Sequence, residues 1–474
     1  MSFTSLSYFL FLPVTAAVYY RLPRRWKNPA LLLFSYGFYL CWTPGHALLL
    51  LGSTLCTWGC GLAIGKGRGS RRLWLLAALL VNFGGLFLFK YFNFFTALVC
   101  GLFGAQPPRL GLALPVGISF FVFQGAGYVI DVYRGRTEPE RSISDYALFI
   151  AFFPHIAAGP IDRAGALLPQ LKAPRPFSDE NLKAGTLRFL WGLTKKLVLA
   201  DGLAAVVDAA FSDVGNYNGG QLLFAALCFA VQLYCDFSDY SDMALGSARV
   251  LGLRLAENFR FPYAARTVRE FWQRWHMSLS TWFRDYLYFP LGGSRVPKWR
   301  HCLNLLIVFA VSGLWHGAAM TFVVWGALHG LLQAGGVLLR PWTGRLGWQE
   351  KPLWRMVSRV RTFALAAGAF VFFRADSLGD AVHVLRSSAG FLLRPYLPAL
   401  TALGQSRAAL AVLGLYLLLL LTVDILSEKR DLSAWFGGRH AARYAAYCFL
   451  IASALIFGRY GNAYDAQEFL YFRF

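Results

Sequence analysis

Two histidines stand in surroundings that favour acid–base chemistry. His316 lies between Trp315 and Gly317, inside a run from His301 to Leu339 that contains no Asp, Glu, Lys or Arg. An imidazole at membrane depth is costly unless it has polar partners or water. Neutral imidazole accepts a proton from an attacking hydroxyl near neutral pH, so His316 is a candidate general base. A packed histidine bonded to a carbonyl is the alternative.

The second histidine, His276, belongs to a stretch whose spacing predicts one helix over Val268–Tyr288. Apolar residues fall at 268, 271, 272, 275, 279, 282, 283 and 286, which is the spacing of one helical face. A helix this strongly two-faced lies along a membrane surface or lines a wet cavity. A solvated surface position is the alternative for His276. The polar stripe beside the apolar face comprises Arg269, Gln273, His276, Ser280 and Arg284.

Other ionisable residues have structural explanations that we favour. Asp236, Asp239 and Asp242 recur every three residues and loosely share a helical face. A divalent cation could bind such oxygen ligands, but we expect polar contacts between helices, or pairing with Arg249 or Arg254, instead. His329 and His155 are expected to serve packing or other structural contacts.

Several classes of active site find no support. The sequence contains no Gly-x-Ser-x-Gly elbow, Walker loop or Gly-x-Gly-x-x-Gly motif, so covalent serine catalysis and NTP hydrolysis are unsupported. Eight cysteines lie within or beside apolar segments, and no second Cys or His pair completes a metal site. We therefore expect packed free thiols and no bound metal.

The elements that must position these residues are membrane helices. Of the 474 residues, 57% are hydrophobic and only 15% are charged, whereas a soluble protein carries about 25% charged residues. We predict an all-α polytopic membrane protein with roughly eleven spans, together with re-entrant and interfacial pieces. The domain is predicted to be single, over 1–474, with N-terminal spans in 1–109, a catalytic core in 110–340 and C-terminal spans in 341–474.

The charge distribution predicts the topology. The net charge of +22 comes from basic residues in short loops at 21–27, 66–72 and 340–361. Because such loops face the cytoplasm, we expect the N-terminus outside and no nucleic-acid partner. If the loops on both sides of 301–339 are cytoplasmic, this run crosses twice. Its reversal would fall near Gly313–Gly317, which would place His316 at a constriction reachable from both sides.

Two segments before this run have particular features. Leu110–Ile130 is apolar and is expected to be another membrane segment. Asp145–Leu171 is also apolar but is interrupted by Pro154, Gly159-Pro160 and Pro169. Broken segments at membrane depth occur only where they line a cavity or pack within protein.

The sequence resembles the membrane-bound O-acyltransferase superfamily, specifically its bacterial branch of alginate O-acetylation proteins. The resemblance covers nearly the whole chain in order and departs from the pattern at His155, where a glutamine is expected, and at Asp239, where a glycine is expected. The stretches that carry it are Leu114-Pro-Val-Gly-Ile-Ser-Phe-Phe-Val-Phe-Gln124, Tyr128-Val-Ile-Asp-Val-Tyr-Arg134, Phe153-Pro154, Ala158-Gly-Pro-Ile161, Tyr234 to Gly246, Glu257-Asn-Phe259, Phe271 to Gly293, Ser312 to Ala318, and Glu468 to Phe474.

The resemblance implies both an architecture and a reaction. Helices would form a ring around a thin centre, with funnels from both faces meeting at the histidine. His316 would be the catalytic histidine and His276 its partner. An acyl group would pass from a cytoplasmic thioester, acetyl-CoA in this branch, to a hydroxyl of an envelope polysaccharide or to an extracytoplasmic SGNH-type transferase. The location would be the bacterial plasma membrane, with no permanently bound cofactor.

Two sets of residues are predicted to serve this reaction. Basic and polar residues of the inner funnel would bind the phosphates of the donor, and other residues would line the tunnel. The donor set is Arg269, Gln273, Arg284 and Arg295, with Arg274 beside it; the tunnel set is Trp275, Ser280, Trp315, Asp236 and Ser312.

Two alternatives remain open. The first is D-alanyl transfer to teichoic acid from a carrier-protein thioester, which the His276 motif would also serve. The second is a proton-coupled transporter in which His276 and His316 relay protons. The sequence lacks the inverted repeat that many transporters show, which weighs against this reading.

Overall fold

The structure is a computed structural model that describes residues 1–42, 44–343, 351–394, 400–460 and 469. Within these ranges every regular element is a helix, which confirms the all-α prediction. The chain forms two compact units. Unit 1 consists of Met1–Phe189 and Tyr240–Glu257, and unit 2 consists of Leu190–Asp239 and Asn258–Phe474.

Unit 1 is built mostly from helices of the N-terminal part of the chain. Two further helices, α9 (Asp179–Thr194) and α11 (Gly219–Val250), contribute residues to both units. The helices that lie within unit 1 are α1 (Leu6–Arg21), α2 (Arg24–Leu40), α3 (Pro44–Gly65), α4 (Arg71–Leu86), the π-helix η1 (Phe87–Tyr91), α5 (Phe92–Leu102), α6 (Ile118–Tyr133), α7 (Ile143–Ala151) and α8 (Ala164–Lys172).

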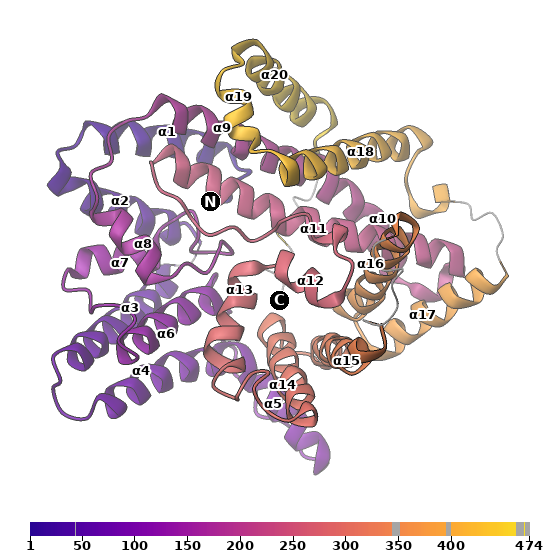
Figure 1. The fold of residues 1–474 in the computed structure, drawn as a ribbon, viewed down its shortest axis with the longest axis horizontal. Coiled ribbons are helices and arrows are strands. Elements are labelled where there is room, and N and C mark those ends of the chain that lie inside the picture. Colours follow the sequence, from indigo (N-terminus) through magenta and orange to yellow (C-terminus); the bar gives the residue numbers. More distant parts are fainter. Residues whose placement is uncertain (43, 344–350, 395–399, 461–468, 470–474) are drawn as a thin grey trace. The chain divides into compact units, whose positions relative to one another are not determined.

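Close packing of α3, α4 and α6 forms one part of unit 1 (Figure 1). Small residues allow α3 and α6 to approach each other. A Cβ on Gly61 would lie 2.6 Å from the Tyr128 ring, and one on Gly125 would lie 3.1 Å from the Thr57 methyl group. Larger side chains at these two positions would push the helices apart.

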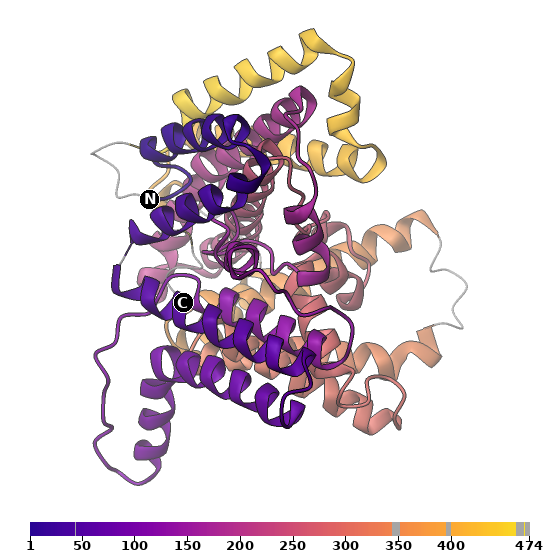
Figure 2. The same ribbon diagram turned by 90° about the vertical axis from the view of Figure 1, so that its left-hand side faces the viewer.

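The apolar segment Leu110–Ile130 is helical only in its second half. Helix α6 begins at Ile118, and residues 103–117 form a loop. The chain preceding α6 contains Pro115 and then Gly117, whose φ of +74° suits glycine. Figure 2 shows this loop, in purple, running back alongside α5. Asn93 holds it there by hydrogen bonds to both the N–H and the carbonyl of Leu110.

The interruption predicted in Asp145–Leu171 is confirmed, because α7 ends at Ala151 and α8 begins at Ala164. Residues 151–162 between them are buried. Buried within this segment, His155 Nδ1 lies 3.2 Å from Asp162 Oδ2, and its Nε2 lies 3.1 Å from the carbonyl oxygen of Phe149. These contacts support the structural role expected for His155.

Unit 2 contains the remaining helices around an aromatic core. Phe271, Trp275, Trp325 and Phe370 are among its buried members. The elements within it are η2 (Lys195–Ala200), α10 (Asp201–Ser212), η3 (Val214–Asn216), η4 (Pro262–Ala264), α12 (Val268–Arg274), α13 (Met277–Phe283), η5 (Arg284–Tyr288), α14 (Lys298–His316), α15 (Met320–Thr343), α16 (Pro352–Arg374), α17 (Leu378–Leu393), η6 (Leu400–Leu403), α18 (Arg407–Lys429), α19 (Leu432–Gly437) and α20 (His440–Phe457).

Seven helices among the described residues are long and apolar enough to cross a membrane, so the protein is a multi-pass membrane protein. The shorter apolar helix α6 adds a candidate, and the predicted number of roughly eleven spans remains a prediction. The seven are Pro44–Gly65, Arg71–Leu102, Gly219–Val250, Met320–Pro341, Pro352–Arg374, Arg407–Lys429 and His440–Phe457.

Candidate active site

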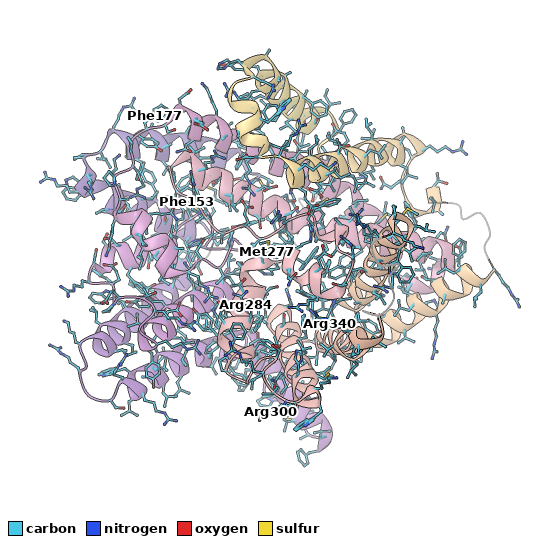
Figure 3. The ribbon with its side chains drawn as sticks, in the orientation of Figure 1. Phe153, Phe177, Met277, Arg284, Arg300 and Arg340 are labelled. Carbon is cyan, nitrogen blue, oxygen red and sulfur yellow. The ribbon has the colours of Figure 1, made fainter. Side chains whose placement is uncertain are left out.

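The stretch around His276 is not one continuous helix, so that prediction was wrong. Helix α12 ends at Arg274, α13 begins at Met277, and the last turn, η5, is a π-helix. Figure 3 labels Met277 and Arg284, which bracket α13. His276 itself has φ +42° and ψ +54°, a left-handed conformation that non-glycine residues rarely adopt. Such strain persists only where the surroundings impose it.

Asn258, which lies outside both helices, stabilises the break between α12 and α13 through hydrogen bonds. Its backbone carbonyl accepts the N–H of Met277 at 2.9 Å. Its side-chain oxygen accepts the hydroxyl of Ser278 at 2.6 Å. A third bond, from the N–H of Arg260 to the carbonyl of Arg274, closes the other side of the break at 3.0 Å. These bonds satisfy backbone groups that a continuous helix would have used internally.

Burial of the aromatic face continues across the break. Trp275 is 3% exposed and packs with its ring centroid 5.1 Å from Phe259 and 5.2 Å from Phe370. His276 is fully buried, with its ring edge-on to Phe237 at 4.5 Å. The polar stripe proposed from the sequence is therefore wrong at His276, because the left-handed turn directs this side chain into the protein.

The second histidine ends the first arm of a helical hairpin. Helices α14 and α15 lie side by side (Figure 1) and are joined at Gly317–Ala319, which confirms the reversal predicted near Gly313–Gly317. A Cβ on Gly313 would lie 2.2 Å from the carbonyl oxygen of Phe322, and one on Gly326 would lie 2.2 Å from that of Phe309. The glycine that precedes His316 by one turn is therefore required by the packing of the two helices.

His276 and His316 meet within unit 2. Their ring centroids are 6.3 Å apart, although 40 positions separate them in the sequence. His316 is 4% exposed, and its ring is perpendicular to Trp325 at 5.0 Å and close to Phe373 at 5.4 Å. At this separation the two imidazoles do not bond directly, because such a bond needs nitrogens about 3 Å apart. The spacing suits two groups that approach one small reacting group.

Burial determines the charge state of one member of the pair. It lowers the pKa of the His276 imidazole well below its usual range, so this ring is neutral at pH 7. A neutral imidazole offers one acceptor nitrogen and one N–H donor. The pair can therefore accept a proton from a hydroxyl and donate a hydrogen bond to an oxygen that gains negative charge.

The residues predicted to line a tunnel are mostly buried. Trp275, Trp315, Asp236 and Ser312 are buried, whereas Ser280 is partly exposed and donates its hydroxyl to the carbonyl of Trp275 at 3.2 Å. Trp315 lies beside His276, with ring centroids 5.9 Å apart. Trp275 directly precedes His276, and Ser312 precedes His316 by about one helical turn. These members of the set are therefore adjacent to the histidine pair.

Asp236 has a different environment, which the sequence did not reveal. Its carboxylate lies 2.6 Å from the ammonium of Lys196, which also lies 3.1 Å from Asp201. Next to it, Lys195 donates to the hydroxyl of Ser238 at 2.6 Å. All of these residues are buried. The signal for this cluster was the Lys195-Lys196 pair within an apolar helix, because buried charges require such partners.

The predicted donor-binding residues lie on the surface. Arg269, Gln273, Arg284 and Arg295 are all exposed. Arg284 pairs with the adjacent Asp285 at 2.9 Å. Arg274 differs from them, since it pairs with Glu270 at 3.0 Å and with Glu428 at 2.6 Å. Arg274 is therefore engaged in structural contacts that the other arginines do not share.

Two structural expectations are confirmed nearby. His329 is fully buried, and its Nδ1 accepts the indole N–H of Trp272 at 3.2 Å, so it serves packing. Asp242 pairs with Arg188 at 2.9 Å within unit 1, as expected for a contact between helices. The described part of the chain contains no group of three His, Cys, Asp or Glu residues that could hold a metal ion. The eight cysteines are free, as expected, but Cys41 and Cys448 are exposed rather than packed.

Comparisons with known proteins agree with the resemblance. Residues 139–365 match the model of the membrane-bound O-acyltransferase family. A probable alginate O-acetylase of Pseudomonas aeruginosa is 40% identical over 383 residues, covering 78% of this chain and 71% of that protein. A peptidoglycan O-acetyltransferase of Helicobacter pylori is 34% identical, covering 82% of this chain and 79% of that protein. A teichoic acid D-alanyltransferase of Bacillus subtilis is 26% identical, covering 56% of this chain and 70% of that protein.

Proposed function

The chain belongs to the membrane-bound O-acyltransferase family, and we propose that it transfers an acetyl group from acetyl-CoA to a hydroxyl of an envelope polysaccharide. As a member of this family it is an O-acyltransferase. The observation that carries the proposed chemistry is the meeting of His276 and His316, two buried imidazoles with ring centroids 6.3 Å apart.

In the proposed reaction His316 acts as the general base. A hydroxyl has a pKa far above 7 and attacks a thioester slowly without a base. His316 removes the hydroxyl proton as the oxygen forms a C–O bond to the thioester carbon. The C–S bond then breaks, the thiolate leaves with the electron pair, and the proton passes from His316 to the sulfur. No metal or redox partner is needed for this balance.

His276 acts on the same reacting group from another side. Burial keeps its pKa low, so the neutral ring can donate its N–H to the carbonyl oxygen of the thioester. Preorganised donors aimed at a developing oxyanion stabilise the transition state. The bonds that Asn258 accepts from the N–H of Met277 and from the hydroxyl of Ser278 fix the direction of this donor.

The donor is proposed to approach from the cytoplasm. Arg269, Arg284 and Arg295 are exposed, and such side chains suit the phosphates of coenzyme A. The cationic loops at 21–27, 66–72 and 340–361 support a cytoplasmic location for this face and an N-terminus outside. The location we propose is the bacterial plasma membrane.

The acceptor is proposed to lie outside the membrane. The relatives from Pseudomonas aeruginosa and Helicobacter pylori are named for O-acetylation of alginate and of peptidoglycan. We propose a polysaccharide of the same general kind here, reached directly or through an extracytoplasmic SGNH-type transferase. D-alanyl transfer has weaker support, since the relative named for it is 26% identical over 56% of this chain.

The direct test supplies purified protein in liposomes with acetyl-CoA that carries a radiolabelled acetyl group. Transfer of label to polysaccharide, or to a partner transferase, together with release of free thiol, is the expected result. D-alanyl carrier-protein thioester serves as the competing donor. Transfer from that donor alone would replace acetylation by the D-alanyl reaction, and release of thiol from neither donor would contradict acyl transfer.

A further inference from the structure

Unit 1 contains a basic pocket that the proposed reaction does not use. Its volume is about 890 Å³. Three segments form its walls: the start of α2, the start of α7, and the end of α8 with the chain that follows it. Among its lining residues are five cations and one carboxylate, namely Arg24, Arg25, Lys27, Lys172, Arg175 and Asp145.

Four of the five cations in the pocket form no ion pair with a carboxylate of the described residues. Asp145 accepts a hydrogen bond from the Asn28 amide at 2.7 Å, and Lys172 is paired with Glu140 at 2.6 Å. The remaining four, Arg24, Arg25, Lys27 and Arg175, make no ion pair with a carboxylate of the described residues. Among the described residues, the pocket therefore holds four cations without an ion pair beside a single carboxylate, Asp145.

Hydrogen bonds to backbone carbonyls hold three of these cations, Arg24, Lys27 and Arg175. Arg24 donates to the carbonyl of Lys172 at 2.7 Å, and Lys27 donates to that of Arg175 at 3.0 Å. One nitrogen of Arg175, Nη2, donates to the carbonyl of Leu171 at 3.0 Å and to the side chain of Asn28. Its other two nitrogens, Nε and Nη1, are buried and have no hydrogen-bond partner within the described part of the chain.

Two of these cations, Lys27 and Arg175, also lie close to aromatic rings. The Lys27 ammonium lies 5.0 Å from the Tyr19 ring and 5.4 Å from the Tyr20 ring, and the Arg175 guanidinium lies 5.4 Å from the Tyr19 ring. Burial lowers the pKa of Lys27, and the charge of Arg175 lowers it further. Cations held this closely repel one another, and a bound anion would remove that repulsion.

Two aromatic residues that are next in sequence to lining residues of the pocket are exposed. Trp26 is 53% exposed and Phe177, labelled in Figure 3, is 57% exposed. Further along α2, Leu33 is 74% exposed, as expected for a side chain that faces lipid. Aromatic side chains with this exposure gather where a membrane meets water. Exposed aromatic residues beside a basic pocket are typical of a site at the level of lipid headgroups.

We propose that this pocket binds the phosphate of an anionic phospholipid of the cytoplasmic leaflet. Arginine and lysine side chains bind phosphate oxygens through charge-assisted hydrogen bonds. Anionic lipids of that leaflet attract clusters of basic residues next to membrane helices. The chemistry is that of any phosphate, and the exposed aromatic residues next in sequence to the lining favour a lipid over a free ion as its source.

The test compares two variants that each remove one arginine and one lysine. Arg25→Gln with Lys27→Gln removes charge from the pocket. Lys66→Gln with Arg68→Gln removes the same charge from an exposed loop of unit 1 that does not line the pocket. Binding of short-chain phosphatidylglycerol to the full chain in detergent is followed by the rise in unfolding temperature. Short-chain phosphatidylcholine and inorganic phosphate are the comparison ligands.

Phosphatidylglycerol should stabilise the wild type and the loop variant equally, and more than phosphatidylcholine does. The apparent Kd of phosphatidylglycerol for the pocket variant should be roughly tenfold higher than for the wild type. The single variant Arg25→Gln, at an exposed position, should show a smaller loss and covers the case in which the double variant does not fold. Equal binding by pocket variant and wild type would overturn the proposal. An equal response to inorganic phosphate would retain a phosphate site and overturn the lipid as its source.

Discussion

The side-chain oxygen of Asn258 accepts a 2.6 Å hydrogen bond from the hydroxyl of Ser278, two residues after His276. Both residues are buried, and the backbone of Asn258 also receives the N–H of Met277. His276 lies in a strained conformation at the start of this bonded segment. Asn258 is therefore a positioning residue for the histidine pair.

Replacement of Asn258 by Ala should lower both stability and turnover. Loss of the acceptor for the buried Ser278 hydroxyl costs about 1–3 kcal/mol of unfolding free energy. Turnover should fall roughly tenfold because the His276 ring is no longer held, while the KM for acetyl-CoA should change little. Unfolding temperature and acetyl-transfer kinetics are the measurements.

A second substitution distinguishes this bond from a general loss of packing. Ser278→Ala in the Asn258→Ala background removes the hydroxyl that was left without its acceptor. The two changes should therefore be less than additive in unfolding free energy, with a coupling of about 0.5–1.5 kcal/mol. Additive losses would show that the bond does not hold the segment.

Acid should destabilise the protein partly through His276. Burial lowers the pKa of His276 in the folded state, whereas in the unfolded chain this pKa is about 6.5. Below pH 6.5 the unfolded chain therefore binds the additional proton. This contribution to stability is complete above about pH 6.5 and decreases by about 1.4 kcal/mol for each pH unit below it.

The comparison is His276→Asn, since asparagine tolerates the left-handed conformation and does not titrate. From pH 7 to pH 5 the unfolding temperature of the wild type should fall more steeply than that of the variant. Parallel pH profiles would show that His276 takes up its proton in the folded state, which would contradict its burial as a neutral ring.

Local spacing in the sequence predicted which side chains are buried around His276 but not the path of the backbone. Phe271, Trp272 and Trp275 are buried as one helical face requires. The break at His276 depends on Asn258, and no pattern within Val268–Tyr288 records that distant contact. A periodicity argument cannot detect a bond from another segment.

Charge distribution was the more reliable guide to the hairpin. Cationic segments on both sides of 301–339 predicted a reversal within this run, and α14 and α15 form a hairpin with its turn at Gly317–Ala319. Helix α17 (Leu378–Leu393) was not predicted, because Asp380 and Arg386 interrupt its apolar residues. The C-terminal motif Glu468–Phe474 lies outside the described residues except for Phe469, so its role in the resemblance has no structural counterpart here.

The exposed arginines should affect binding of the donor. Arg269→Gln, Arg284→Gln and Arg295→Gln should each raise the KM for acetyl-CoA severalfold with little change in kcat, because phosphate contacts are equal in the ground and transition states. Steady-state kinetics with purified protein measures both parameters.

Arg274→Gln is the matched control for these three variants. Its pairs with Glu270 and Glu428 predict a lower unfolding temperature and an unchanged KM. Near-normal kinetics in all three exposed variants would dismiss the phosphate contacts. A KM increase in Arg274→Gln as large as theirs would show a general effect of lost charge.

Topology can be tested with single cysteines. Arg25→Cys, Arg68→Cys and Lys351→Cys, each in a variant without the eight natural cysteines, should resist an impermeant thiol reagent in intact cells and react after permeabilisation. Short cationic loops remain in the cytoplasm during insertion. Mass spectrometry of the labelled protein gives the readout.

Natural Cys41 provides the outward control. It is exposed and lies in the connection between α2 and α3, which the same topology places outside. A variant that retains Cys41 alone should be labelled in intact cells. Labelling of any of the three loop cysteines from outside would reverse the assignment.

The strongest prediction concerns His316. Removal of a positioned general base typically costs roughly 10²–10⁴-fold in rate. His316→Ala should therefore remain folded and bind the donor, but it should transfer acetyl more slowly by roughly this factor. His276→Asn should also impair transfer, by a smaller factor if it stabilises charge on the thioester oxygen. The double variant should be little worse than His316→Ala, because groups that act in one step are not additive.

His329 is the matched control for both substitutions, since it is a third buried histidine of unit 2 and its Nδ1 accepts the Trp272 N–H. His329→Gln should lower the unfolding temperature yet retain turnover per folded molecule within a few fold. Transfer assays in liposomes, with unfolding temperatures measured in parallel, separate lost chemistry from lost structure. Wild-type turnover in His316→Ala would refute the base assignment, because the C–O bond would then form without the proton acceptor on which the mechanism depends.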